Sequence, residues 1–420
     1  MDAAPPIDAV ITWVDGSDPA HRQRLQAYLR ECGHAETGGA APTRFGDCNE
    51  IEYCVASLLR HAPWLRTIHI VTDQQAPAFI ARLRGTALES RVRVVDHREF
   101  FGGYESFLPT FSNRAIECLM WRIPGLAERF VYCNDDFVLL RAVAPTDFFL
   151  PEGGLVLRGR WRGDGRVFRR ARAAWTALAQ RLGRDPRPGN HAAQALSARL
   201  AGVCGHYLQA PHAPHPMRVS VLRAFFDAHP GLIEHNLQHR LRHVDQFVTT
   251  ALAAHLEWAA GTARVDNRLE ALRLQCDGAG LALIERKLAT ADADAAIAFA
   301  CVQSLDLATA PVRERVLGWL AQRVGRLPGA SSRDRCAAGA RRGIARPGPP
   351  PGVRCRCPAA AGPGRRKRDK PADAARARRS DGTPACARRR ARSSPHRSAS
   401  TSRSSRSRGT AARARSRGGS

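Results

Sequence analysis

The sequence is poor in lysine and in long apolar runs. Of its 420 residues, 65 are basic, but only 3 of these are lysine and the rest are arginine, a bias that fits GC-rich coding. No apolar run reaches the ~18 residues of a membrane-spanning helix, and no basic-then-apolar leader follows Met1. These absences argue against a membrane-embedded or secreted protein. We expect a cytoplasmic protein, either free or bound peripherally at the inner face of the membrane.

Cysteines with metal-binding spacing are also absent. The cysteines of residues 1–330 form no CxxC pair, which excludes the zinc and redox motifs that depend on such pairs. Several lie among apolar residues, so we expect small, buried, reduced side chains. The eight residues are Cys32, Cys48, Cys54, Cys118, Cys133, Cys204, Cys276 and Cys301.

The last stretch of the chain lacks the side chains that build a core. Residues 331–420 contain no Leu, Met, Phe, Trp or Tyr. They bury too little apolar area to offset the roughly 1–2 kcal/mol per residue that ordering a backbone costs, so we expect a disordered tail rich in Arg, Ala, Pro and Ser. Its abrupt start favours an out-of-frame read of the gene, and an arm that binds nucleic acid is the alternative.

The charge of the chain belongs mostly to this tail. The formal net charge is +27, and residues 331–420 hold 26 basic and 4 acidic side chains, a net of +22. Residues 1–330 therefore carry only +5. Nucleic acid is not an expected partner of this body, because a mild surplus of this size is ordinary for a globular protein.

Apolar runs alternate with stretches of helical period in the first 157 residues. The rhythm predicts an α/β fold with a doubly wound, largely parallel sheet. We expect residues 1–157 to form the nucleotide- and metal-binding part, and residues 158–330 to form a mostly helical part that completes the active site. The strands are expected at Ile7–Val14, Thr67–Val71, Val92–Val95 and Phe130–Cys133, and the helices at Ala20–Cys32, Ile51–Leu59 and Ser112–Met120.

Each of these four strands ends in a carboxylate. The acids are Asp15, Asp73, Asp96 and the pair Asp135-Asp136. Ligands of open α/β sheets bind beyond the carboxyl ends of the strands, and acids there need a cation before they can face phosphates. Mg²⁺ takes one or two carboxylates together with phosphate oxygens. The sequence therefore predicts a nucleotide-phosphate site with Mg²⁺ or Mn²⁺, while caps of helices or turns are the alternative for single acids.

Histidine and arginine gather in the middle of the chain. His212 and His215 lie in a turn with Pro211, Pro214 and Pro216, where the prolines prevent the helical spacing of metal ligands. A neutral imidazole can act there as a general base. Further along, Arg242 and His243 precede a helix and could clamp phosphate, or could be plain surface charges.

Four ordered segments of the chain resemble the Stealth family. The first is Ile7–Gly16. The second includes Arg44–Glu50, Ala62–Asp73, Val95-Asp-His97, Leu108–Phe111, Ala115-Ile-Glu117 and Tyr132–Asp136. The third joins His212–His215 to Arg242–Asp245, and the fourth is Phe299–Asp306 with Trp319-Leu320. Together the segments span about residues 7–322 in the order of the family.

The resemblance implies a hexose-1-phosphate transferase. Bacterial Stealth proteins build phosphodiester-linked capsule or exopolysaccharide, and animal relatives transfer N-acetylglucosamine 1-phosphate. An acceptor sugar hydroxyl would attack the β-phosphate of a UDP-sugar, with an N-acetylhexosamine as the expected sugar, and UMP would leave. A metal-dependent glycosyltransferase that releases UDP is the alternative, because Asn134-Asp135-Asp136 is also similar to its acidic motif.

The resemblance also implies roles for single residues. Asp135 and Asp136 would hold the divalent ion, and Asn134 would orient it or donate to phosphate. His215 or His212 would take the acceptor proton, and Arg242 would neutralise charge on the transferred phosphoryl group. The residues expected to bind the nucleotide-sugar donor are Thr12, Asp15, Gly16, Arg44, Asn49, Glu50, Asn134 and His243. An oligo- or polysaccharide would be the acceptor.

Overall fold

The computed structural model describes most of the chain before the Arg-rich tail. It describes residues 5–32, 46, 48–165 and 189–329, and six positions between 170 and 181. These residues belong to the first of two units of the chain, Met1–Ala361. Arg44 and the predicted tail, residues 331–420, lie outside the described residues.

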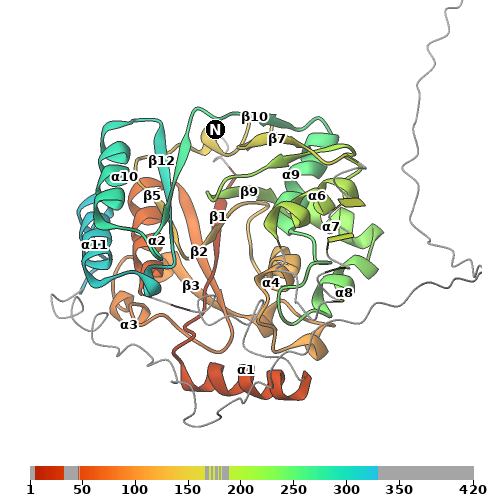
Figure 1. Ribbon diagram of the computed structural model, residues 1–420, viewed down its shortest axis with the longest axis horizontal. Coiled ribbons are helices and arrows are strands. Elements are labelled where there is room, and N and C mark those ends of the chain that lie inside the picture. Colours follow the sequence, from red (N-terminus) through yellow and green to blue (C-terminus); the bar gives the residue numbers. More distant parts are fainter. Residues whose placement is uncertain are drawn as a thin grey trace, which may run out of the picture. The chain divides into compact units, whose positions relative to one another are not determined.

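A five-stranded sheet lies at the centre of this unit (Figure 1). Its strands are β1 (Ile7–Thr12), β2 (Leu65–Thr72), β3 (Val92–Asp96), β4 (Arg129–Asn134) and β9 (His215–Arg218). In the order β3-β2-β1-β4-β9, the first four strands are parallel and β9 runs antiparallel to β4. The predicted α/β fold with a largely parallel sheet is confirmed.

Smaller sheets join the two halves of the chain. In one of them β12 lies between β11 and β5, and in another β10 pairs with β6; β7 pairs with β8. The bounds are β5 Phe137–Leu139, β6 Leu155–Leu157, β7 Arg160–Gly163, β8 His206–Gln209, β10 Ala263–Val265, β11 Glu270–Gln275 and β12 Ile297–Gln303. Residues 158–330 therefore contribute strands as well as helices, because short strands find distant partners that local periodicity does not reveal.

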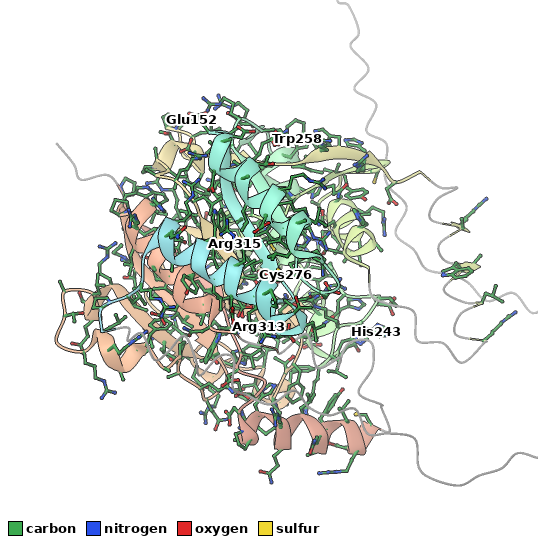
Figure 2. The ribbon with its side chains drawn as sticks, turned by 60° about the vertical axis from the view of Figure 1, so that its left-hand side comes forward. Glu152, His243, Trp258, Cys276, Arg313 and Arg315 are labelled. Atoms are coloured by element: carbon green, nitrogen blue, oxygen red, sulfur yellow. The ribbon has the colours of Figure 1, made fainter. Side chains whose placement is uncertain are left out.

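Helices cover both faces of the central sheet. Their bounds are α1 Pro19–Cys32, α2 Glu50–His61, α3 Ile80–Leu83, α4 Asn113–Leu119, α6 Asn190–Leu200, α7 Val219–Ala228, α8 Gly231–Leu237, α9 Thr249–Ala259, α10 Leu281–Ala293 and α11 Ala310–Val324. In Figure 1, α2, α10 and α11 lie on one side of the sheet, and α4 and α6–α9 lie on the other. Figure 2 shows α10 and α11 side by side, with Arg313 and Arg315 on α11. None of the helices in the described ranges is both long and apolar enough to cross a membrane.

The alternation of side chains along β1 divides the core into two layers. Ala9 and Ile11 pack in the cluster that contains α2, α10 and α11, whereas Val10 packs with α4, α7 and α9. Successive side chains of a strand point to opposite faces, so an apolar residue at every position fits a strand that is covered on both sides. This arrangement leaves the strand ends as the positions where polar side chains reach solvent.

One polar side chain is nevertheless buried inside β1. Asp8 is fully buried and pairs with Arg66, whose Nε donates to Asp8 Oδ1 at 2.9 Å. It also accepts from the backbone amides of Thr67 at 3.2 Å and Ala127 at 2.8 Å. His69 Nε2 lies 3.2 Å from Asp8 Oδ2. These contacts tie β1 to β2 and to the segment before β4 at the end of the sheet opposite the predicted site.

The eight described cysteines are free of disulfide bonds. Most are buried as expected, while Cys48 is half-buried and Cys32 and Cys204 are exposed. The buried ones fill small spaces in the core: Cys54, Cys118, Cys133, Cys276 and Cys301.

Candidate active site

The carboxyl ends of the four parallel strands meet at one edge of the central sheet. Thr12, the last residue of β1, lies opposite Asn134 of β4 and Val71 of β2. Thr72 of β2 lies opposite Asp96 of β3 in turn. The acids that follow these strands are therefore neighbours in space, as the sequence predicts, but their local contacts differ.

Three of the acids take part in the structure of their own loops. Asp15 Oδ1 accepts the Ser17 amide at 2.8 Å. Asp73 forms an ion pair with Arg24 at 3.1 Å. Asp96 Oδ2 accepts the Gln74 amide at 2.8 Å, and the same side chain caps a short 3-10 turn that begins at His97. Each of these three carboxylates thus has partners that explain why an acid stands at its position.

Loop and cap contacts of this kind do not explain the position of the Asp136 carboxylate. Its Oδ2 lies 3.2 Å from Cys301 Sγ of β12. Its Oδ1 is buried and has no hydrogen-bond partner among the described residues. Burial raises the pKa of Asp136 to about 6. A buried carboxylate oxygen without a donor is costly unless a cation meets it. The pair Asp135-Asp136 therefore fits a divalent ion, which would be held by oxygen ligands as Mg²⁺ and Mn²⁺ prefer.

A buried tyrosine links the ends of β1 and β4. The hydroxyl of Tyr132 lies 2.8 Å from Thr12 Oγ1, 3.0 Å from Asn134 Oδ1 and 3.2 Å from Glu117 Oε1. Because the tyrosine hydroxyl meets the carbonyl oxygen of the Asn134 side chain, the amide NH₂ of that side chain is directed elsewhere. Asn134 is thus oriented as a hydrogen-bond donor next to Asp135.

Arg242 reaches this network from the loop before α9. Its Nε donates to Asn113 Oδ1 at 2.7 Å, and Asn113 Nδ2 donates to Glu117 Oε1 at 3.1 Å. Burial lowers the pKa of Arg242, and the negative charges of Glu117 and Asp136 oppose that shift. The guanidinium group therefore lies within electrostatic range of Asp136, where it can meet an anionic group of a ligand.

Glu117 is a site residue to which the sequence gave no role. It lies on α4, is 4% exposed, and its Oε2 has no hydrogen-bond partner among the described residues. Burial raises the pKa of Glu117 to about 7, and Arg242 partly opposes this. The available signal was a glutamate between Ala115 and Cys118 on the apolar face of a predicted helix, where an acid without a partner is rare.

The two candidate histidines occupy different surroundings. His215 is in β9 opposite Tyr132, and its ring centroid is 6.4 Å from that of Phe137. Burial, with smaller contributions from His212 and Arg158, lowers the pKa of His215 to about 4. Its side chain helps to line a small pocket with Arg158, Leu208 and Thr250.

His212 shares its surroundings with the arginines of the site. Burial lowers its pKa, followed by the positive charges of Arg273 and Arg242. It is therefore neutral at physiological pH and lies within electrostatic range of Arg242, which the acid pair also faces. Of the two histidines, His212 is the one on which the charges of Arg242 and Arg273 act.

Arg273 is the second residue that the sequence did not reveal. It lies on β11, where its Nε donates to Gln303 Oε1 at 2.7 Å and its Nη2 donates to Gln275 Oε1 at 2.9 Å. Its charge acts on both Asp136 and His212. No sequence signal marked it, because its position depends on the pairing of β11 with β12.

Several residues expected to bind the donor lie after β1 and at the start of α2. Asn49 has a left-handed backbone, with φ at 71°, and its Nδ2 donates to Glu52 Oε2 at 2.8 Å. Glu50 is buried and accepts the Cys48 amide at 2.6 Å. Gly16 accepts from Arg22 Nε at 2.9 Å through its carbonyl oxygen. These contacts shape the loops after β1 and before α2.

His243 is grouped with other histidines rather than with the acid pair. Its ring stacks on that of His239, with centroids 4.1 Å apart and planes 10° from parallel. Its Nδ1 lies 3.4 Å from Asp245 Oδ2. The neighbouring Arg242 side chain contacts Asn113, which in turn contacts Glu117. The two adjacent residues, Arg242 and His243, therefore contact different groups of side chains.

Comparison with known families gives two matches. Residues 5–31 match the description Stealth protein CR1, conserved region 1, and residues 44–156 match Stealth protein CR2, conserved region 2. The matched ranges contain β1 to β4, Glu117 and the acid pair.

Curated relatives match part of the chain. An exopolysaccharide phosphotransferase of Streptomyces coelicolor is 46% identical over 153 residues, which is 36% of this chain and 27% of the relative. One from Nocardia farcinica is 35% identical over 220 residues, 52% of this chain and 39% of that protein. A capsular polysaccharide phosphotransferase of Aeromonas hydrophila is 36% identical over 150 residues, 35% of this chain and 39% of the relative. The chain thus matches between about a quarter and two fifths of the length of these relatives.

Solved structures are more distant. The galactosyltransferase LgtC in complex with donor and acceptor sugar analogs has a TM-score of 0.37 and 12% identity; the match covers 79% of this chain and 99% of that chain. A likeness at this level says nothing about what this chain binds.

Proposed function

From the matches to two conserved regions of the Stealth family, we propose that the chain is a member of this family and that it transfers a hexose 1-phosphate from a UDP-sugar to a hydroxyl of an acceptor sugar in the synthesis of capsular or exopolysaccharide. The proposal rests on one observation above all. Three groups from separate segments of the chain interact through their charges near the carboxyl edge of the central sheet. The charge of Asp136, in the acid pair Asp135-Asp136, acts on Arg242, and the charge of Arg242 acts on His212. Phosphoryl transfer needs a cation site, a positive clamp and a base in this proximity.

The proposed reaction exchanges one phosphorus–oxygen bond for another. The oxygen of the acceptor hydroxyl attacks the β-phosphorus, the bond from this phosphorus to the bridging oxygen breaks, and UMP leaves. The hydroxyl proton passes to the ring of His212, which burial, Arg273 and Arg242 keep neutral before the reaction. His215 is the less suitable base, because it is paired in β9 and its pKa of about 4 makes it a weak proton acceptor.

Two arginines would meet the charge of the transferred group. Arg242 is held by Asn113 at 2.7 Å, so its remaining N–H groups can donate to phosphate oxygens in a fixed direction. Arg273 is held by Gln303 and Gln275, and its charge acts on Asp136. Positive groups fixed in advance stabilise charge that develops in the transition state without a cost of reorganisation.

Asp135 and Asp136 would hold the divalent ion, since the buried Oδ1 of Asp136 lacks a donor within the part of the chain that the structure describes. Mg²⁺ or Mn²⁺ bound there would neutralise the diphosphate oxygens of the donor. Asn134, oriented by Tyr132, would donate its amide to the same diphosphate. We assign the rest of the donor site to Thr12, Asp15, Gly16, Asn49 and Glu50 from the resemblance and from the position of their loops, and to Arg44 from the resemblance alone.

The released nucleotide tests the proposal. The full chain is incubated with UDP-N-acetylglucosamine or another UDP-sugar, Mg²⁺ and an oligosaccharide acceptor, and the nucleotide product is identified. We expect UMP. Release of UDP instead would contradict the proposal and identify a glycosyltransferase, which breaks the bond at the anomeric carbon.

Variants test the residues. Asp135→Asn and Arg242→Gln should each lower kcat by roughly 100–1000-fold, and His212→Gln by roughly 100–10,000-fold. Asp227→Asn, at an exposed position of α7, is the matched control and should leave kcat unchanged. Wild-type turnover of Asp135→Asn without added metal would contradict the metal assignment, and wild-type turnover of His212→Gln would exclude it as the base.

A further inference from the structure

Two histidines and an aspartate form a compact group on the loop between α8 and α9. His239, His243 and Asp245 each offer a ligand atom, and these atoms all lie within 4.8 Å of one another. The loop also carries Arg242, whose side chain points to the active-site network. Figure 2 labels His243. The group shares no residue with the acid pair Asp135-Asp136.

The distances are close to those that a tetrahedral ion needs. Zn²⁺ bonds to nitrogen and carboxylate oxygen at about 2.0–2.2 Å, which sets neighbouring ligand atoms roughly 3.3–3.6 Å apart. His243 Nδ1 and Asp245 Oδ2 are already 3.4 Å apart. The rings of His239 and His243 are nearly parallel, so one of them must turn about χ2 before both nitrogens can point to one ion. His243 is 41% exposed, and a side chain with this freedom turns readily.

The protonation state of the proposed ligands suits Zn²⁺, which accepts both nitrogen and oxygen ligands. Burial, helped by His243 and His235, lowers the pKa of His239 to about 4, so its ring is neutral at physiological pH. Neutral imidazole is the form that binds metal. Two imidazoles and one carboxylate are a donor set for Zn²⁺ rather than for Mg²⁺, which prefers oxygen alone.

The backbone around the group is already braced. His235 Nε2 lies 3.0 Å from the carbonyl oxygen of Asp245. Arg114 Nη1 donates to the carbonyl oxygen of His243 at 2.9 Å, and the His243 amide donates to Gln246 Oε1 at 3.0 Å. These contacts fix the backbone from which the side chains of His243 and Asp245 extend.

We propose that His239, His243 and Asp245 bind one Zn²⁺-class ion, with a fourth position open to water, and that this ion fixes the loop that carries Arg242. Metal binding here does not depend on the proposed transferase activity. The ion would serve as a structural brace at the rim of the active site, separate in place and in chemistry from the cation at Asp135-Asp136.

Metal titration of the full chain tests this site. Zn²⁺ is titrated by calorimetry in the presence of saturating Mg²⁺, and Co²⁺ is titrated by its visible absorption, which reports tetrahedral coordination. Cys32 and Cys204, which are exposed among the described residues, and the tail cysteines Cys336, Cys355, Cys357 and Cys386 are first replaced by Ser so that they cannot contribute ligands. We expect one Zn²⁺ per chain and a rise of Tm on binding. No binding by this protein, or an octahedral Co²⁺ spectrum, would overturn the proposal.

Matched variants locate the site. His243→Gln and Asp245→Asn should each weaken Zn²⁺ binding by more than about 100-fold, beyond the roughly 10–100-fold that outer contacts cost. Both side chains are well exposed, so the fold should persist. His229→Gln, whose ring stacks on Phe225, is the control and should bind as the parent does. Asp135→Asn should also bind Zn²⁺ normally, which separates this proposal from the proposed function. Unchanged affinity in His243→Gln and Asp245→Asn would refute it.

Discussion

Two buried carboxyl groups of this protein have pKa values that are shifted in opposite directions. Burial alone would raise the pKa of Asp8, but hydrogen bonds from His69, Arg66 and Ala127 lower it to about 2. Glu117 accepts fewer bonds, and burial raises its pKa to about 7. The first carboxylate is fully compensated and the second is held ready to bind a proton, which fits a structural role for one and a site role for the other.

Asp8→Asn should lower the free energy of unfolding by about 1–3 kcal/mol, because it removes the charged acceptor of Arg66 and of the amides of Thr67 and Ala127. The native pKa lies below the ordinary value of 3.8, so the stability due to ionised Asp8 is present above pH 3.8 and is lost as the pH falls toward 2. This component is roughly 2 kcal/mol. Urea unfolding between pH 2 and pH 7 measures it, with the exposed Glu285→Gln as control. Equal acid sensitivity of Asp8→Asn and the parent would disprove this role.

Glu117→Gln should have the opposite dependence on pH. The native pKa lies above the ordinary value of 4.5, so the unfolded chain releases this proton at a lower pH than the folded chain. The parent should therefore lose roughly 3 kcal/mol of stability as the pH rises from about 4.5 to about 7. Gln keeps the shape and has no proton to release, so the variant should show a flatter profile in the same unfolding assay. An identical slope in both proteins would contradict the raised pKa.

Arg273→Gln should change the pH profile of catalysis. The charge of Arg273 helps to lower the pKa of His212, so its removal raises that pKa. The acidic limb of kcat/KM against pH should then move to higher pH, because the base must be neutral. Arg268→Gln is a suitable control, since Arg268 pairs with Asp266 at the surface. A limb that does not move in Arg273→Gln, or that moves as far in the control, would argue against His212 as the base.

At the scale of elements, the strands of the first half were predictable and those of the second half were not. Each of the four parallel strands is an apolar run that ends near an acid, and the predicted bounds agree with β1 to β4 within two residues. The same pattern led to the prediction of a site at Asn134-Asp135-Asp136. Strand β9 contains Pro216 and was interpreted as a rigid turn, yet proline is tolerated here because β9 lies at the edge of the sheet.

Glu117 and Arg273 mark the limit of what the sequence could predict about the site. Glu117 acquires its role from the contact with Tyr132, 15 residues away along the chain. Arg273 acquires its role from the pairing of β11 with β12 and of β12 with β5, which brings it beside Asp136. Such roles follow from packing between distant segments, and no local pattern records them.

Strand β12 supports the acid pair through β5. Phe299 of β12 lies opposite Leu139 of β5, is fully buried and packs against Phe148. Phe299→Ala should lower the free energy of unfolding by about 3–5 kcal/mol. It should also raise the Mg²⁺ concentration needed for half-maximal activity, because β5 directly follows Asp136. Leu307→Ala, at a side chain that is 50% exposed, should change stability by less than about 0.5 kcal/mol. Equal effects of the two changes would contradict this support.

At the scale of the whole molecule, the described core ends near Leu327, which is 4% exposed. A chain of residues 1–330 should therefore keep its Tm and its transferase rate, while any affinity for DNA should fall together with the +22 charge of residues 331–420. Thermal unfolding, the UMP assay and DNA binding at several salt concentrations measure these three properties. DNA affinity that persists in residues 1–330 would show a nucleic-acid site in the body.

The contacts of Asp8 have a consequence for the alignment of the strands. A slip of β1 by one residue would turn Asp8 to the opposite face and separate it from Arg66, Thr67 and Ala127. The cost of an unpaired buried charge excludes this slip, so the register of β1 is set at the amino end of the strand. Thr12 lies four positions further along, about 13 Å away. The hydrogen bond between Thr12 and Tyr132 thus depends on the contacts of Asp8, which fix the register of β1 at the opposite end of the strand.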